Sequence, residues 1–256
     1  MTDMNIINAV DRALDMLIYM YNAGTEVSIT KISEDMGVYK STVFRTLATL
    51  EAKGFVTKNP ETEKYSLGIR LYIMGTSIGE KIGIQKLVKP YAKALHDEFN
   101  EAVNVSILER NEKDIYRSVM IYKEENNQIL RFNSEVGSRN DCHCAAVGKC
   151  LLAFSENIDL SIYDQRPMIK YTEHTIVTRK ELEKELEKVR LQGFAVDYEE
   201  REMGLTCIGA PIFKNGQYAV AAISLSGPTS RIKDETFQRK IDRLCQVTRE
   251  ISNSLR

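Results

Sequence analysis

Apolar residues in the first seventy positions recur at helical spacing in three short segments. In the first segment they lie three or four positions apart, with charged residues between them, at Ile6, Val10, Leu14, Leu17 and Tyr21. This stripe predicts an amphipathic helix. Residues 28–37 predict a second, shorter helix, because Ser28 or Thr30 can cap its start and Gly37 can supply a left-handed exit.

Residues 40–54 predict a third helix, which follows the second after only two residues and ends at Gly54. Its expected buried stripe consists of Val43, Leu47 and Leu50, with Phe44 at the flank. The opposite face carries short hydroxyls and long cations: Lys40, Ser41, Thr42, Arg45, Thr46 and Thr49. Two short helices joined by a tight turn are typical of the helix-turn-helix, whose second helix enters the major groove of DNA. On this interpretation Arg45 can bind guanine through two hydrogen bonds.

A hairpin is predicted immediately after these helices. Residues 55–58 and 64–67 are β-like runs, and the segment between them has a turn composition. As a wing beside the recognition helix, this hairpin would place Lys58 and Lys64 next to the phosphate backbone, where cations add affinity for any sequence. The net charge of -1 gives no overall attraction to DNA, but the local charge changes from acidic to basic at Lys40, and Arg12 joins the candidate DNA contacts.

The remainder of the chain predicts a second, larger unit of the α+β class. Apolar residues and three glycines in residues 71–85 indicate a helical joint, and a periodic helix follows to Phe99. Strands are expected at 103–109, 114–122, 128–136, 194–198, 207–213 and 217–227. Helices are expected from His143 to Phe154, from a Thr178–Glu181 capping box to Gly193, and over 237–251. Asn215-Gly216 is a strong hairpin signal between the last two strands.

The segment "DCHCAAVGKC", residues 141–150, allows three interpretations. A zinc site is disfavoured because Cys142 and Cys144 are one residue apart and no second Cys/His pair follows, although His143 could converge with Glu199 or Glu200 in the fold. A nucleophilic cysteine beside His143 lacks an evident orienting residue. The third interpretation is a pocket wall, in which a helix starting near His143 directs its first free amides at a carboxylate.

In this third interpretation the cysteines line the wall and carry no chemistry, and no arginine is required. Ser224 and Ser226 share one face of a strand and can donate to the ligand's remaining oxygens. The charged segment 197–204 is interpreted as a solvated loop, from which we retain only Asp197. A buried Asp197 would favour a hydroxyl-bearing ligand over a bare diacid, because like charges repel.

Length and composition restrict these possibilities. A chain of 256 residues is long enough for two domains, and no stretch approaches the about 18 apolar residues of a membrane span. Five cysteines without even spacing do not form a disulfide framework, and the N-terminal segment lacks the basic leader of a secretory signal. We therefore expect a cytoplasmic protein without membrane contact, cofactor or metal.

The quoted residues resemble the IclR-type bacterial transcriptional regulators. In the first unit the matching words are "VDRALDML", "YKSTVFRTLATLEAKGFV" and "PETEKYSLGIRL". In the second they are "GSRNDCHCAAVGKCLLAF", "HTIVTRKELEKELEKVRLQGFAVDYEEREMGLTCIGAPIF" and "AAISLSGPTSRI". Departures from the family pattern are Tyr39, where proline is usual, and Cys142 and Cys144, where leucine and alanine are usual.

The resemblance implies an α+β fold with a winged helix-turn-helix at residues 1–74, a helical linker at 75–85 and a GAF-like α/β sandwich with a mainly antiparallel sheet at 86–256. It implies a small organic acid as effector, such as a keto or hydroxy acid from sugar-acid or carboxylate catabolism. The implied ligand contacts are Ala146, Val147, Asp197, Cys207, Ser224 and Ser226. It further implies a homodimer or homotetramer that represses transcription from a palindromic double-stranded operator. The alternative is a metal- or thiol-dependent sensor or enzyme that uses Cys142, His143, Cys144 and Cys207.

Overall fold

The computed structural model describes residues 6–110, 116–125 and 135–255. The chain forms two compact units, Met1–Ile82 and Gly83–Arg256. Helix α4 (Ile69–Ile82) ends the first unit and helix α5 (Ile84–Phe99) begins the second, with Gly83 between them at a φ of 66°. A positive φ favours glycine, so this residue suits the point where one helix ends and the next begins.

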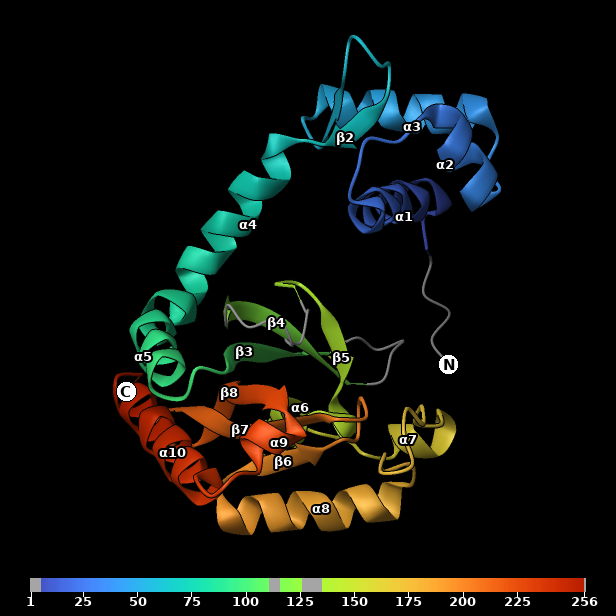
Figure 1. The fold of residues 1–256 in the computed structure, drawn as a ribbon. Coiled ribbons are helices and arrows are strands. Elements are labelled where there is room, and N and C mark those ends of the chain that lie inside the picture. Colours follow the sequence, from blue (N-terminus) through green and yellow to red (C-terminus); the bar gives the residue numbers. More distant parts are fainter. Residues whose placement is uncertain (1–5, 111–115, 126–134, 256) are drawn as a thin grey trace. The chain divides into compact units, whose positions relative to one another are not determined.

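The first unit has the predicted helix-turn-helix and wing (Figure 1). Its elements are α1 (Asn8–Ala23), α2 (Ile29–Met36), α3 (Lys40–Ala52), β1 (Val56–Lys58), β2 (Tyr65–Leu67) and α4. Ser28 caps α2 by accepting a hydrogen bond from the backbone N–H of Lys31, and Gly37 ends the helix at a φ of 64°. Strands β1 and β2 pair antiparallel, as the hairpin prediction requires.

The stripe predicted for α1 is only partly the one that packs against the core. Met16 and Met20 are buried and Leu17 is half-buried, whereas Val10 and Leu14 are 53% and 54% exposed. Apolar residues occur on several sides of this helix, so their spacing alone could not select the packed face. On α3, Val43 and Leu47 are buried as predicted, but Phe44 is exposed, which corrects its expected place at the edge of the core.

The described residues of the second unit form one sheet of six strands, β5–β4–β3–β8–β7–β6, in which all neighbours are antiparallel. The strands are β3 (Ala102–Glu109), β4 (Arg117–Glu124), β5 (Arg139–Asp141), β6 (Ala195–Tyr198), β7 (Leu205–Lys214) and β8 (Tyr218–Pro228). Asn215 and Gly216 connect β7 to β8 with φ values of 52° and 68°, which confirms the predicted hairpin. Of the strand expected at 128–136, residues 128–134 lie outside the described residues.

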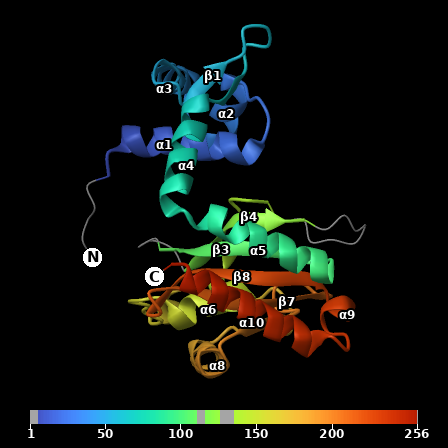
Figure 2. The same cartoon turned by 90° about the vertical axis from the view of Figure 1, so that its left-hand side faces the viewer.

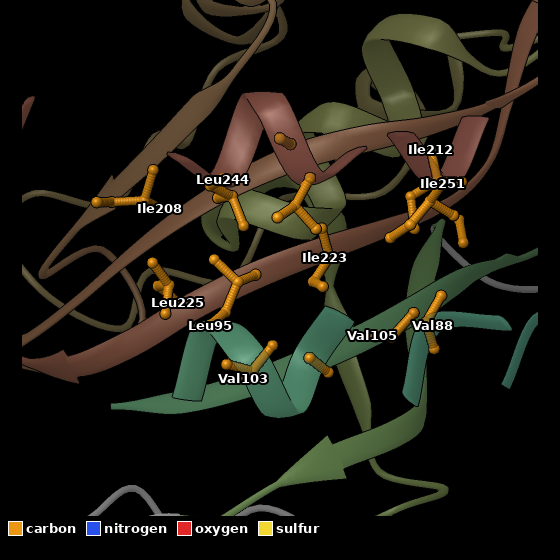
Figure 3. Packing of buried hydrophobic residues seen from close by; sticks show 14 of the residues in the cluster. Val88, Leu95, Val103, Val105, Ile208, Ile212, Ile223, Leu225, Leu244 and Ile251 are labelled. Atoms are coloured by element: carbon orange, nitrogen blue, oxygen red, sulfur yellow. The ribbon is translucent and has the colours of Figure 1, made fainter. Parts of the chain in front are cut away.

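Helices cover both faces of this sheet. On one face α5 lies beside α10 (Phe237–Asn253), as Figure 2 shows. Side chains of these helices pack on the apolar face of β3, β7 and β8, where Val103, Ile208, Ile223 and Leu225 are buried (Figure 3). Helices α6 (Ala146–Phe154) and α8 (Arg179–Gln192) pack together on the other side, with the 3-10 turn η1 (Cys142–Cys144). Short helices α7 (Ile162–Gln165) and α9 (Thr229–Ile232) complete the unit.

Alternation along β8 makes the second face polar at one end. Ala221, Ile223 and Leu225 enter the core beneath α5 and α10, so Ser224 and Ser226 lie on the opposite face. Thr178 caps α8 together with Glu181, and Gly193 ends it, as predicted. Among the described residues, we find no helix with the length and apolar character that crossing a membrane requires.

Candidate functional site

The N-terminus of α6 is the centre of the candidate site. Its N-cap residue, Ala145, provides no side-chain cap, and the first N–H groups of a helix have no acceptor within the helix. These amides and the positive end of the helix dipole attract an anion. Gly209 of β7 lies against this helix end, since a Cβ atom there would be only 2.8 Å from the carbonyl carbon of Ala146.

The predicted start of this helix at His143 is wrong. Residues 142–144 form the 3-10 turn η1, and the α-helix begins at Ala146. Gly148 packs so closely on Cys142 that a Cβ atom would lie 2.4 Å from the Cα atom of Cys142. The turn therefore folds back over the first turn of the helix, which continuous helical geometry would not allow.

All six expected ligand contacts line one cavity of about 40 Å³ in front of α6. They are Ala146, Val147, Asp197, Cys207, Ser224 and Ser226. The wall also includes residues that the sequence interpretation missed: Asn104, Ser106, Met120, Asn140, Ala145, Arg201 and Leu205. Asn104 and Ser106 come from β3, whose register sets Asn104 opposite Ser224. The alternating polar residues of "VNVSILE" were the available signal for these two positions.

The sheet side of the cavity is a connected polar surface. Asn104 donates from Nδ2 to Oγ of Ser226 over 3.1 Å, and the hydroxyls of Ser224 and Ser226 are 3.2 Å apart. All three side chains are buried. Because their mutual bonds fix them, they present hydrogen-bonding groups to the cavity with little freedom to rearrange.

Asp197 contributes a buried carboxyl group from the end of β6. Its Oδ1 accepts a hydrogen bond from the backbone N–H of Glu200 at 2.9 Å. Burial, reinforced by the charge of Glu200, raises the pKa of Asp197 to about 7. Near neutral pH this group can therefore donate a proton to a hydrogen bond or accept one.

A buried ion network holds the segment that follows Asp197. Lys149 of α6 is fully buried, and its Nζ donates to the carbonyl of Val196 at 2.7 Å and to Oε1 of Glu200 at 2.5 Å. Glu185 of α8 lies 3.4 Å away from the same nitrogen. Burial opposes the charge of Lys149, but these carboxylates keep its pKa above the ordinary value. Glu200 is buried, so the prediction that the glutamates of this segment are solvated is wrong for this residue.

Arg201 brings a cation to the cavity wall. Its guanidinium lies over the ring of Tyr171, 3.7 Å from the ring centroid, and the hydroxyl of Tyr171 donates to Asp141. Stacking of this kind leaves the edge of the guanidinium free to donate hydrogen bonds. The run of charges in 197–204 concealed this residue, because its spacing does not distinguish a pocket arginine from a solvated one.

The thiols have the properties of packed side chains. Cys142, Cys144 and Cys150 are fully buried, and burial raises the pKa of each thiol, so the nucleophilic thiolate is disfavoured. His143 bonds through Nε2 to the carbonyl of Ile169 at 3.0 Å, and burial lowers its pKa. Within residues 6–110, 116–125 and 135–255, no three His, Cys, Asp or Glu side chains gather as a metal site. The geometry gives the metal or thiol alternative no support.

The predicted DNA-binding face of α3 is on the surface. Lys40, Ser41, Arg45 and Thr49 are exposed, whereas Thr42 and Thr46 are half-buried. Arg12 and Arg45 line the same groove of about 740 Å³ between α1 and α3. In the wing, Lys64 is exposed, but Nζ of Lys58 lies 2.8 Å from Oε1 of Glu63. A phosphate would compete with Glu63 for Lys58.

Comparisons with known proteins agree with this arrangement. Residues 9–60 match the IclR helix-turn-helix domain, and residues 77–253 match the bacterial transcriptional regulator IclR C-terminal family. The chain is 32% identical to the HTH-type transcriptional regulator XynR of Escherichia coli, over 98% of both chains. It is 28% identical to the transcriptional repressor IclR of Escherichia coli, over 90% of this chain and 83% of that one.

A solved structure shows the same fold along the chain. The crystal structure of Thermotoga maritima IclR has a TM-score of 0.77 and 29% identity, and covers 98% of this chain and 99% of its own. These relatives are transcriptional regulators and not enzymes. On this evidence the chain belongs to the IclR family of bacterial transcriptional regulators.

Proposed function

We propose that this regulator is a cytoplasmic repressor whose affinity for operator DNA changes when the cavity in front of α6 binds a small organic acid. The supporting observation is that the first residues of α6, Ala146 and Val147, line one cavity together with buried polar side chains, which are Asn104, Asp197, Ser224 and Ser226. A carboxylate satisfies the amides, and oxygens elsewhere on the ligand satisfy the polar wall.

The size of the cavity restricts the acid. A volume of about 40 Å³ has room for about three water molecules, since one water needs about 10–15 Å³ of such space. This room suits a keto or hydroxy acid of about two or three carbons better than an aromatic acid.

The charges around the cavity also suit an acid. Arg201 and the α6 terminus together offset the ligand's carboxylate, while the raised pKa of Asp197 limits repulsion from this side chain near neutral pH. The ionised form of Asp197 would repel a second carboxylate close to it, so we favour a monocarboxylic acid with one further oxygen.

DNA binding is assigned to the exposed face of α3 and to the wing. Arg45, Ser41 and Thr49 are exposed and can contact base edges or phosphates, and the exposed Lys64 lies on the wing. One such helix reads one half-site, so a palindromic operator calls for two copies.

Apolar side chains on the surface of the first unit fit pairing of two copies. They are Val10, Leu14, Ile18 and Tyr21 on α1, and Ile69, Tyr72, Ile73 and Met74 on α4. Exposed apolar groups of this extent mark interaction surfaces. A second copy of the chain is our proposed partner, as a homodimer or as two dimers in a homotetramer, and sedimentation of the full chain tests it.

A ligand screen tests the proposal. Small carboxylic acids are added to the full chain, and unfolding is followed with temperature; an acid at 100 times its dissociation constant stabilises the fold by about 2.7 kcal/mol. The same acid must change operator affinity in a gel shift. Ser226→Ala should weaken binding of the acid. Ser230 is an exposed serine of α9, so Ser230→Ala should leave binding of the acid unchanged. If no small acid affects unfolding or operator binding, the proposed effector class is wrong.

A further inference from the structure

In the part of the chain that the structure describes, the polar wall of the cavity contains one buried acceptor without a partner. Asn104 is 4% exposed and lines the cavity, and its Oδ1 has no hydrogen-bond partner among the described residues. A buried acceptor without a donor costs free energy, so native structures rarely retain one without a reason. The amide cannot simply rotate away, because its Nδ2 already donates to Oγ of Ser226.

The neighbouring side chains do not supply the missing donor. The hydroxyls of Ser224 and Ser226 are 3.2 Å apart and Ser226 accepts from Asn104, but neither hydroxyl forms a hydrogen bond with Oδ1. The register sets Asn104 directly opposite Ser224, so both side chains rise from the same face of the sheet beside the cavity. The group that completes Oδ1 must therefore come from whatever occupies the cavity.

We propose that Asn104 determines which oxidation state of the effector binds, and that the effector is a hydroxy acid and not the matching keto acid. This inference rests on the proposed function and specifies its ligand. A hydroxyl group donates to Oδ1 of Asn104, while its oxygen still accepts from a serine hydroxyl. A ketone oxygen can only accept, so it gives Oδ1 no donor and leaves this buried acceptor unpaired.

Two observations fit a ligand with both a carboxylate and a hydroxyl. The α6 terminus and Arg201 provide for the anion, and Asn104 lies on the sheet side of the same cavity. The cavity volume of about 40 Å³ leaves room for only a short acid, so its second oxygen cannot lie far from the wall. A site built to bond a donor rejects the analogue that lacks it, because its own polar group then stays unpaired.

The test uses three acids of equal carbon number: lactate, pyruvate and propionate. They carry a hydroxyl, a ketone and no second oxygen group, respectively. Binding of each to the full-length protein is measured by calorimetry. Lactate should bind at least about tenfold more tightly than pyruvate, as expected for one satisfied buried acceptor. Equal affinities, or tighter binding of pyruvate, would overturn the assignment of Asn104.

Variants separate a specific role from a general one. Asn104→Leu removes the acceptor and should bring the lactate-to-pyruvate ratio close to one. Asn104→Asp retains an acceptor of the same shape, so it should keep the preference for lactate even if added negative charge weakens both acids. Asn140→Leu makes the same change at a half-buried asparagine of the cavity wall and should leave the ratio intact. A preference for lactate that survives in Asn104→Leu would refute the inference.

Failure of this inference differs from failure of the proposed function. If lactate and pyruvate bind with equal affinity and change operator affinity equally, the proposal of a small-acid effector is supported and the proposed role of Asn104 is wrong. If none of the three acids binds, the small-acid effector falls, and the inference falls with it.

Discussion

Asp197 should make the stability of this protein fall as the pH rises. Burial and the charge of Glu200 raise its pKa from the ordinary 3.8 to about 7. A carboxyl whose pKa is higher in the folded state stabilises the fold fully below its unfolded pKa, and this contribution is lost as the pH rises through the folded pKa. Between about pH 5 and pH 7, therefore, the unfolded chain is ionised at this position while the folded chain keeps the proton.

The size of the effect follows from that interval. At about 1.4 kcal/mol for each pH unit, about two units correspond to about 3 kcal/mol of folding free energy. Asp197→Asn removes the titration and keeps an oxygen that can accept from the backbone N–H of Glu200. The unfolding free energy of the variant minus that of the unmodified protein should therefore rise by about 2–3 kcal/mol as the pH is raised from about 5 to about 8. Burial of the new amide N–H groups adds a cost that is the same at every pH, so the test compares the change in stability with pH and not the stability at one pH.

Urea unfolding at a series of pH values measures this difference. The chain contains no tryptophan, so far-ultraviolet circular dichroism and tyrosine fluorescence provide the signal. Asp234→Asn is the matched control, because the hydrogen bond from Lys240 holds the pKa of Asp234 low, at about 2. Its contribution is present above 3.8 and is lost only as the pH falls toward about 2, so this control should be destabilised equally across the series. A constant difference between Asp197→Asn and the unmodified protein would show that Asp197 does not titrate as its burial requires.

Three further predictions concern DNA binding, packing and the buried ion network. Arg45→Ala should lower specific operator affinity by about 1–3 kcal/mol, while Lys64→Ala should weaken binding to all DNA sequences alike and reduce the slope of log affinity against log salt concentration by about one. Gel shifts with operator and random DNA over a salt series measure both effects. An unchanged preference for operator DNA in Arg45→Ala would contradict the assignment of α3 as the recognition helix. Gly209→Ala should displace the start of α6, because its Cβ would lie 2.8 Å from the backbone of Ala146. The variant should lose about 1–3 kcal/mol in unfolding free energy and bind the acid more weakly. Calorimetry that finds the acid affinity unchanged would argue against binding of the acid by the α6 amides. Lys149→Met should cost about 3–5 kcal/mol by leaving a buried carboxylate unpaired, and a urea midpoint equal to that of the unmodified protein would refute it.

The elements of both units could be predicted from the sequence because they depend on neighbours along the chain. Ser28 and Gly37 delimit α2, Thr178 caps α8, and Asn215-Gly216 forms the hairpin, each through local backbone chemistry. The resemblance also identified six side chains that the structure brings to one cavity. Helix α1 was harder to predict, since apolar residues on several sides left its packed face open until Met16 and Met20 met the core.

Only the tertiary structure decided the parts that depend on contacts between distant segments. Arg201 and Glu200 belong to a run of charges whose sequence gives no sign that one lines a cavity and the other pairs with Lys149. Helix α6 starts at Ala146 and not at the predicted His143, because Gly148 packs on the backbone of the preceding turn. The unpaired oxygen of Asn104 likewise arises from the register of β3 against β8, since hydrogen bonds across a sheet are set by strand pairing and not by spacing along one strand.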